Sequence, residues 1–202
     1  MPADRTPRRP DVTTTDIVGG AEPVRITLHD YDERWPAAFE AHRRRIVEAL
    51  APTGTEAGTE AGGDVQVEHI GSTAVPGLAA KPIVDVVVVV PDITAEEDYL
   101  DPLLAAGYEL RVREPGHRLV RTPERDVHVH VYERGATAVD EYLLLRDHLR
   151  ADTADRDLYA ATKRELLDRR WDDMNEYADA KTEVITAIKG RARAAREGRH
   201  MS

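Results

Sequence analysis

The chain has 202 residues, 41% of them hydrophobic, and this size and composition predict one packed domain with short tails. It contains no cysteine, which excludes disulfides, thiolate-bound zinc, iron–sulfur clusters and a cysteine nucleophile. Its net charge of −10 argues against a duplex-binding protein, because such proteins more often carry a basic excess.

The first fifty residues predict a tail, a strand and a helix. Residues 1–21 are rich in Pro, Arg, Thr and Asp without periodicity, so we expect a disordered tail. This segment lacks the apolar stretch of a secretory signal, and we expect a cytoplasmic protein. Apolar residues at 24, 26 and 28 predict a short strand. Pro36 suits the first turn of a helix that we expect to reach Leu50.

The middle of the chain predicts an insertion between the helix and two strands. Residues 53–63 read TGTEAGTEAGG and indicate a flexible surface insertion. Strands are expected over 65–70 and 82–90, and the second is apolar on both faces apart from Asp85, as in the interior of a sheet. Its longest apolar run, Val86–Val90, falls far short of the ~20 residues of a membrane helix. We therefore expect no membrane contact.

The rest of the chain predicts more strands and then only helices. Thr94 as cap and Gly107 as stop predict a helix over 94–106. Thr137 and Thr153 are expected caps of later helices. The expected strands are 108–112, 117–121 and 126–132, and the expected helices are 138–150, 154–170 and 174–195. The fold class is therefore α+β, with a sheet-bearing core over 22–136, a C-terminal helical segment packed on it over 137–195, and a tail over 196–202.

A Gly-Ser turn and an acidic strand form the first candidate site. Gly71, Ser72 and Thr73 follow a predicted strand, and such a turn brings backbone N–H groups and a hydroxyl close to phosphate oxygens. Asp85 lies within an apolar run, where a carboxylate must meet a metal, a cation or a hydrogen-bond donor. It could hold Mg²⁺ against substrate phosphates, or it could be a structural residue paired with an arginine.

Lysine is rare in this chain, and the few lysines stand at informative places. Lys81 precedes Asp85 by four residues, and Lys163 and Lys181 each follow a tyrosine by four. The compact ammonium of lysine is a good partner for phosphate. Packing of a lysine stem on the tyrosine is the alternative for Lys163 and Lys181. A basic cluster over 189–202 is interpreted as a solvated helix end, not a nucleic-acid contact.

Two histidines share one face of a predicted strand. His128 and His130 alternate with valines in DVHVHVY, so both imidazoles project to one side. Such a pair can bind a metal, donate to phosphate oxygens or relay protons, or it can be a pair of partly exposed sheet histidines. Weaker signals come from Glu68, His69, His117 and Arg118.

These residues together resemble the motifs of a known family. The run VEHIGSTAVPGLAAKPIVDVVVVV, residues 67–90, resembles the signature of the GrpB family. The resemblance covers about residues 24–190 and leaves out the tails and the insertion. Further matches follow in order: Tyr31 with Trp35, HVHVY at 128–132, YLLLRDHLR at 142–150, Tyr159 with Lys163, and Tyr177 with Lys181.

The resemblance implies a nucleotidyltransferase-like fold, with a mixed sheet, flanking helices and a Gly-Ser turn leading to an acidic strand. Some family members are fused to dephospho-CoA kinase, which implies nucleotide or coenzyme A metabolism and association with a coenzyme A biosynthetic enzyme. The chain departs from active nucleotidyltransferases, which carry a second acid where Val87 stands and a third where it has His128 and His130. Two-metal catalysis needs ligands for two ions ~3.5–4 Å apart, and these residues hold at most one.

Three functions remain open from the sequence. The first is a nucleotidyl- or phosphoryl-transfer enzyme that acts on a nucleotide or a phosphorylated small molecule. The second is a non-catalytic nucleotide- or coenzyme-binding module, and the third is a single-metal phosphohydrolase. In the first, residues 71–73 hold phosphates, and Lys81 and Lys181 neutralise charge. Asp85, His128 and His130 then hold one divalent ion, Mg²⁺ or Mn²⁺, or orient the nucleophile.

Overall fold

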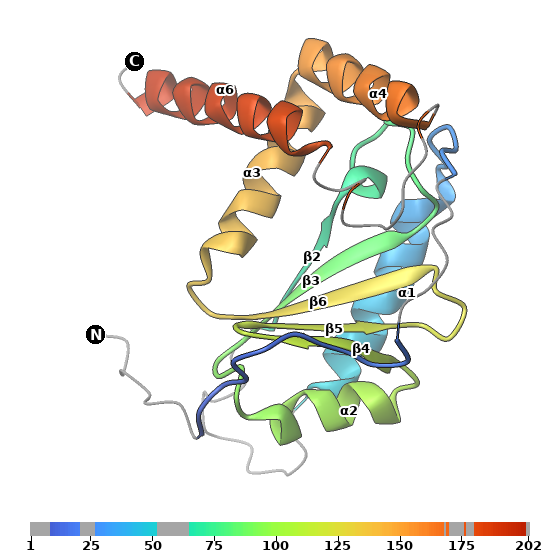
Figure 1. Cartoon of the computed structure of the whole chain (residues 1–202), viewed down its shortest axis with the longest axis vertical. Coiled ribbons are helices and arrows are strands. Elements are labelled where there is room, and N and C mark those ends of the chain that lie inside the picture. Colours follow the sequence, from blue (N-terminus) through green and yellow to red (C-terminus); the bar gives the residue numbers. More distant parts are fainter. Residues whose placement is uncertain are drawn as a thin grey trace.

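The described residues form a six-stranded mixed sheet with helices on both faces (Figure 1). The computed structural model describes residues 9–20, 27–51, 65–167, 169, 176 and 180–200. The strands are β1 (Asp16–Ile17), β2 (Gln66–Ile70), β3 (Val84–Val90), β4 (Glu109–Glu114), β5 (His117–Arg121) and β6 (Val127–Glu133). They lie in the order β1-β4-β5-β6-β3-β2, and only β3 and β6 run parallel among these neighbours.

The helices divide between the two faces of the sheet and one end of the molecule. They are α1 (Arg34–Ala49), α2 (Leu100–Ala105), α3 (Thr137–Ala151), α4 (Thr153–Leu167) and α6 (Thr182–His200), with 3₁₀ turns η1 (Ser72–Ala74) and η2 (Glu96–Asp98). In Figure 1, α4 and α6 gather with α3 at one end. The predicted α+β class with a mixed sheet and flanking helices is confirmed. Within the described parts of the chain, no helix combines the length and apolar character needed to cross a bilayer.

Alternation along β3 separates two buried layers. Val84, Val86, Val88 and Val90 belong to the larger core, which includes residues of α1 and α2. Val87 and Val89 belong to a second cluster, which includes Val139 of α3. Because side chains alternate along a strand, Asp85 lies on the same face as the second cluster. The interior position expected for this strand is therefore observed, between β2 and β6.

The structure corrects the expected helix over 94–106. The segment forms η2 and then the short helix α2, and the Thr94 hydroxyl donates to Asp92 and does not cap a helix. Pro102 explains the break, because it lacks a backbone N–H and is tolerated only near a helix start. The predicted caps Thr137 and Thr153 are also wrong, because each is the first residue of its helix: Ala136 is the cap of α3, and before α4 the Asp152 carboxylate accepts the backbone N–H of Asp155 at 2.9 Å. Helix α6 extends to residue 200, past the expected end.

The segment 9–20, expected within the tail, lies against the sheet. β1 pairs with β4, and Asp11 accepts a hydrogen bond from the guanidinium of Arg118 at 2.6 Å. Arg118 is 2% exposed and also donates to Glu96, so its charge is balanced inside the fold. Arg118, a weak candidate from sequence, is thus part of this structural network. The expected strand over 24–28 and the insertion over 53–63 lie mostly or wholly outside the described residues.

The C-terminal helices hold the loop that follows β2. Val75 and Leu78 of this loop are fully buried in a cluster with side chains from α3, α4 and α6. Arg150 of α3 donates to the carbonyl of Ala74 at 2.8 Å, and Lys163 of α4 donates to the carbonyl of Ala79. The loop that carries the Gly-Ser turn is therefore positioned by residues more than seventy places further along the chain.

Candidate functional site

Asp85, His128 and His130 meet on the face of the sheet that α3 covers. The parallel pairing of β3 and β6 places Asp85 beside His128, and Val87 beside His130. His128 Nδ1 and His130 Nε2 each lie 3.7 Å from Asp85 Oδ1. One ligand atom from each residue lies within 4.8 Å of the other two. The sequence prediction that these three residues converge matches this geometry, and the cluster could hold one metal ion.

The cluster is half-buried and remains accessible. The side chains of Asp85, His128 and His130 are 30, 24 and 17% exposed, so a ligand can reach them from solvent. Burial lowers the pKa of His128 to about 4 and outweighs the opposing effect of Asp85. The His128 imidazole is therefore neutral at neutral pH and offers a lone pair.

Gly71 lets the turn after β2 approach Asp85. Its φ of +71° and ψ of −169° belong to a region that only glycine adopts readily. A Cβ at this position would lie 2.6 Å from Asp85 Oδ2, which is closer than real Cβ contacts. The absence of a side chain at Gly71 therefore brings the Gly-Ser turn and the carboxylate into direct proximity.

The two hydroxyls of the turn have different surroundings. Ser72 Oγ accepts a hydrogen bond from Lys163 Nζ at 3.0 Å. The Thr73 hydroxyl is buried, where it donates to the carbonyl of Ile83 and pairs with His69 Nε2. The structure thus brings Ser72 to the site and turns the side chain of Thr73 into the interior, so only the backbone of Thr73 can face a ligand.

Lys163 contacts the turn, and the charges of Lys81 and Lys181 act on neighbouring groups. Burial lowers the pKa of Lys163 to about 7, and the cation of Lys181 adds to this effect. Burial also lowers the pKa of Lys181, while the charge of Asp85 raises it and that of Lys81 lowers it. Of the lysines predicted from sequence, Lys181 thus lies within electrostatic range of Asp85 and of Lys81, and Lys81 lies within that range of His128. Tyr177 lies outside the described residues, so its expected pairing with Lys181 is not described.

Glu68 and His69 lie on opposite faces of β2. His69 stacks on Phe39 of α1 at a centroid distance of 4.7 Å, on the face away from Asp85. Burial lowers the pKa of His69 to about 4, which fits a neutral side chain of the core. Glu68 accepts a hydrogen bond from Arg146 of α3 at 2.8 Å. Neither residue joins the Asp85 cluster.

Two residues beside the cluster were not selected from sequence. Lys163 carried the four-residue spacing from Tyr159, and its ammonium does lie over the Tyr159 ring at 4.6 Å. The same ammonium also reaches Ser72, a contact that no local spacing signals. His117 carried a weak signal, and its Nε2 lies 3.1 Å from His130 Nδ1.

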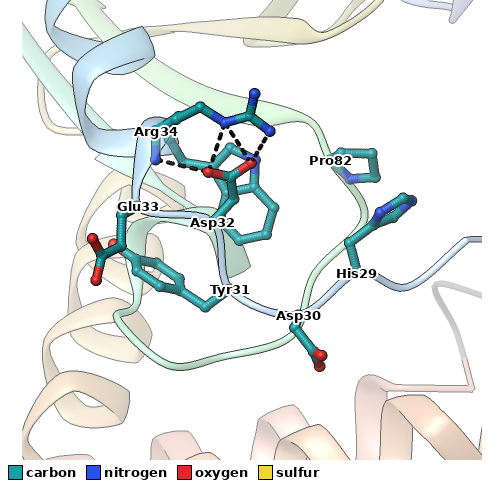
Figure 2. Close-up of a pocket in the computed structure, with 8 residues that line it drawn as sticks. His29, Asp30, Tyr31, Asp32, Glu33, Arg34 and Pro82 are labelled. Carbon is teal, nitrogen blue, oxygen red and sulfur yellow. Dashed lines mark hydrogen bonds and ion pairs between the residues drawn. The ribbon is translucent and has the colours of Figure 1, made fainter.

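A separate cavity of about 500 Å³ is lined by residues 29–35 and Pro82 (Figure 2). Among the lining residues, the carboxylate of Asp32 accepts a hydrogen bond from the guanidinium of Arg34, while Asp30 points away from this pair. The pKa of Asp32 is lowered to about 2, first by its hydrogen bond from Arg34. None of the predicted site residues lines this cavity, although Pro82 follows Lys81 directly. The candidate site therefore remains at Asp85.

Comparison with known proteins shows a clear family relationship. The family model described as GrpB protein matches residues 25–191. A UPF0157 protein of Streptomyces coelicolor is 68% identical over 189 residues, which cover 94% of this chain and 96% of that protein. The crystal structure of conserved protein GrpB from Enterococcus faecalis has a TM-score of 0.67 and 28% identity, and covers 82% of this chain and 96% of that one.

Two more distant similarities are to proteins named as a kinase and a polymerase. A dephospho-CoA kinase of Mycolicibacterium paratuberculosis is 31% identical over 79% of this chain and 43% of that protein. The Cid1 poly(U) polymerase has a TM-score of 0.45 and 15% identity, over 65% of this chain and 42% of that one.

Proposed function

This chain belongs to the GrpB family, and from that premise we propose that it is a nucleotidyltransferase-like enzyme acting on a nucleotide or another phosphorylated small molecule. The proposal rests on the approach of the Gly71 turn to Asp85. Two imidazoles lie 3.7 Å from this carboxylate, and the charge of Asp85 acts on Lys181. Phosphate oxygens and a divalent cation are the ligands that such a set recognises.

Each group has a distinct part in the proposed transfer. Backbone N–H groups of Gly71, Ser72 and Thr73 hold phosphate oxygens, while Lys81 and Lys181 neutralise the charge that develops during transfer. Lys163 is a positioning residue, because its hydrogen bond fixes the Ser72 hydroxyl. Lys163 and Lys181 both come from the C-terminal segment, so this segment completes the site.

The donor set fits one divalent ion and does not fit two magnesium ions. Two-metal sites need ligands for two ions ~3.5–4 Å apart, and Val87 occupies the position next to Asp85 on the same face of β3. Asp85, His128 and His130 offer one oxygen and two nitrogens. Of the two ions expected from sequence, Mn²⁺ accepts imidazole more readily than Mg²⁺, which prefers oxygen. Such an ion would supply charge stabilisation and orientation to a bound phosphate.

A substrate screen with a matched pair of variants tests the proposal. Nucleotides and coenzyme A precursors are incubated with protein and Mg²⁺ or Mn²⁺, and products are identified by mass spectrometry. We expect Asp85→Asn to abolish product formation and Asp101→Asn, on the exposed part of α2, to leave it unchanged. Equal turnover by Asp85→Asn would remove this residue from the mechanism.

The absence of a second carboxylate on β3 favours one alternative, a non-catalytic nucleotide- or coenzyme-binding module. In that case calorimetry detects binding of a nucleotide or a coenzyme A precursor, this binding does not depend on metal, and no product forms. A single-metal phosphohydrolase, the other alternative, would release inorganic phosphate and depend on the three-residue cluster. The cytoplasmic location and the association with a coenzyme A biosynthetic enzyme stay predictions.

A further inference from the structure

A row of four polar side chains crosses the sheet from β4 to β3. Glu114 Oε1 lies 2.5 Å from His117 Nδ1, and His117 Nε2 lies 3.1 Å from His130 Nδ1. The far nitrogen of His130, Nε2, lies 3.7 Å from Asp85 Oδ1. These residues come from four adjacent strands, so the register of the sheet holds the whole row in place.

The surroundings of His117 fix the plane of its ring. His117 stacks on Tyr132 with a centroid distance of 4.6 Å and an angle of 15° between the planes. The planes of His117 and His130 differ by 12° and their centroids are 5.2 Å apart. Together with the nitrogen–nitrogen distance of 3.1 Å, this separation shows that the two imidazoles meet edge to edge. The rings therefore have the geometry of a hydrogen bond.

The carboxylate of Glu114 determines which ring nitrogen carries the proton in His117 and, through His117, in His130. An ionised carboxylate only accepts, so neutral His117 must carry its proton on Nδ1 and present Nε2 as an acceptor. His130 then carries its proton on Nδ1, and its Nε2 is left with a lone pair. That lone pair faces Asp85 Oδ1, another acceptor, at a distance too long for a hydrogen bond.

Three ligand atoms, one from each of Asp85, His128 and His130, therefore lie close together. His128 Nδ1 also lies 3.7 Å from Asp85 Oδ1, which is again too long for a hydrogen bond. Ligands ~2.1 Å from a tetrahedral ion lie ~3.4 Å from one another, and the two separations from Asp85 Oδ1 are close to that value, while all three ligand atoms lie within 4.8 Å of one another. Convergence of lone pairs at this spacing is the arrangement that a cation stabilises.

From this geometry we infer that Glu114 and His117 are positioning residues for a metal centre at Asp85, His128 and His130, and that it binds a single imidazole-preferring ion. This inference rests on the proposed function for its metal site, and it adds Glu114 and His117 as the residues that orient His130 toward that site. Its ion belongs to the first-row divalent series from Mn²⁺ to Zn²⁺, because a set of one carboxylate and two imidazoles suits these ions better than Mg²⁺. Outer partners of this kind orient ligand histidines and raise their basicity.

The first test measures metal affinity in the full-length protein after removal of metal with a chelator. Titration with Co²⁺ and Zn²⁺, followed by calorimetry and by the visible absorption of bound Co²⁺, compares the wild type with Glu114→Gln and His117→Phe. We expect a ten- to hundredfold weaker affinity in both variants. Glu109→Gln, an exposed glutamate on the same strand, is the matched control and should bind as the wild type does.

The second test reads the tautomer directly and needs no metal. Nitrogen-15 NMR of the metal-free protein should show neutral His130 with its proton on Nδ1, and Glu114→Gln should mix the two tautomers. If His117→Phe does not fold, Glu114→Gln still tests the inference, because glutamine has nearly the same size as glutamate.

The outcomes separate the inference from the proposed function. Weak Co²⁺ binding by the variants, without turnover by the wild type, supports the inference and overturns the transfer reaction. Turnover that depends on Asp85, with equal Co²⁺ affinity in wild type and both variants, overturns the inference alone. A wild-type preference for Mg²⁺ over Co²⁺ and Zn²⁺, or a His130 proton on Nε2, also overturns the inference.

Discussion

Replacement of Gly71 by alanine tests the close approach on which the site depends. The added Cβ would lie 2.6 Å from Asp85 Oδ2 and 3.2 Å from Asp85 Cβ, so the carboxylate must move by about half an ångström or more. The backbone at φ +71° and ψ −169° costs a non-glycine residue about 1–3 kcal/mol. Displacement of packed neighbours adds about 1–3 kcal/mol, and the reduced entropy of the unfolded chain offsets up to about 1 kcal/mol.

We therefore expect Gly71→Ala to lower the free energy of unfolding by about 1–6 kcal/mol, the range that these three contributions span. Urea denaturation followed by circular dichroism measures the change, provided that the m-value is constant. Gly77→Ala is the matched control, because Gly77 also has a positive φ, +78°, but no atom within 4 Å of the added Cβ. Its expected cost is about 1–2 kcal/mol, from the backbone alone.

The difference between the two variants isolates the contact with Asp85. If both variants lose the same free energy within about 0.5 kcal/mol, the turn does not press on the carboxylate and the reasoning fails. Co²⁺ titration of the same proteins should show weaker binding by Gly71→Ala and unchanged binding by Gly77→Ala, since only the first displaces a ligand.

Three further substitutions, one of them with a control variant, probe the C-terminal segment. The folded-state pKa of Lys163 is about 7 against 10.5 in the unfolded chain, so the unfolded chain holds more protons in that interval and stability should rise with pH from about 7 to 10. Lys163→Met should flatten this rise in urea titrations at several pH values. Asp155→Asn should cost about 1–3 kcal/mol and speed hydrogen exchange in α6, because Arg191 and His148 lose their charged acceptor. Lys181→Met should weaken binding of a phosphorylated ligand about tenfold by calorimetry, whereas Lys189→Met, in a residue paired with Glu141, should not.

Each of these expectations has a contrary result. If the wild type and Lys163→Met have the same pH dependence of stability, burial does not lower the pKa of Lys163 in the folded protein. Faster exchange throughout the protein after Asp155→Asn, with no excess in α6, would show that the ion pair does not hold this helix. Equal affinities of the Lys181 and Lys189 variants would place Lys181 outside the binding site.

Local patterns predicted much of the sheet. The alternation of His128 and His130 with valines predicted that both imidazoles share a face, and β6 has this arrangement. The apolar run around Asp85 predicted an interior strand, which β3 is. The expected helix over 94–106 is wrong because Pro102, which is tolerated only near a helix start, divides the segment into η2 and α2. Period-two alternation also agrees with the opposite faces on which Glu68 and His69 lie.

The sequence by itself determined the α+β class, the strand that carries Asp85, the shared face of the two histidines and the family, because each depends on local periodicity or on a continuous motif. Only the tertiary structure decided that β3 and β6 pair in parallel, a register between strands 43 residues apart that no local pattern specifies. The same holds for the Lys163 ammonium beside Ser72, 91 residues away, and for the row from Glu114 to Asp85. Local backbone preferences set which way a side chain faces, whereas its partners depend on how distant segments pack.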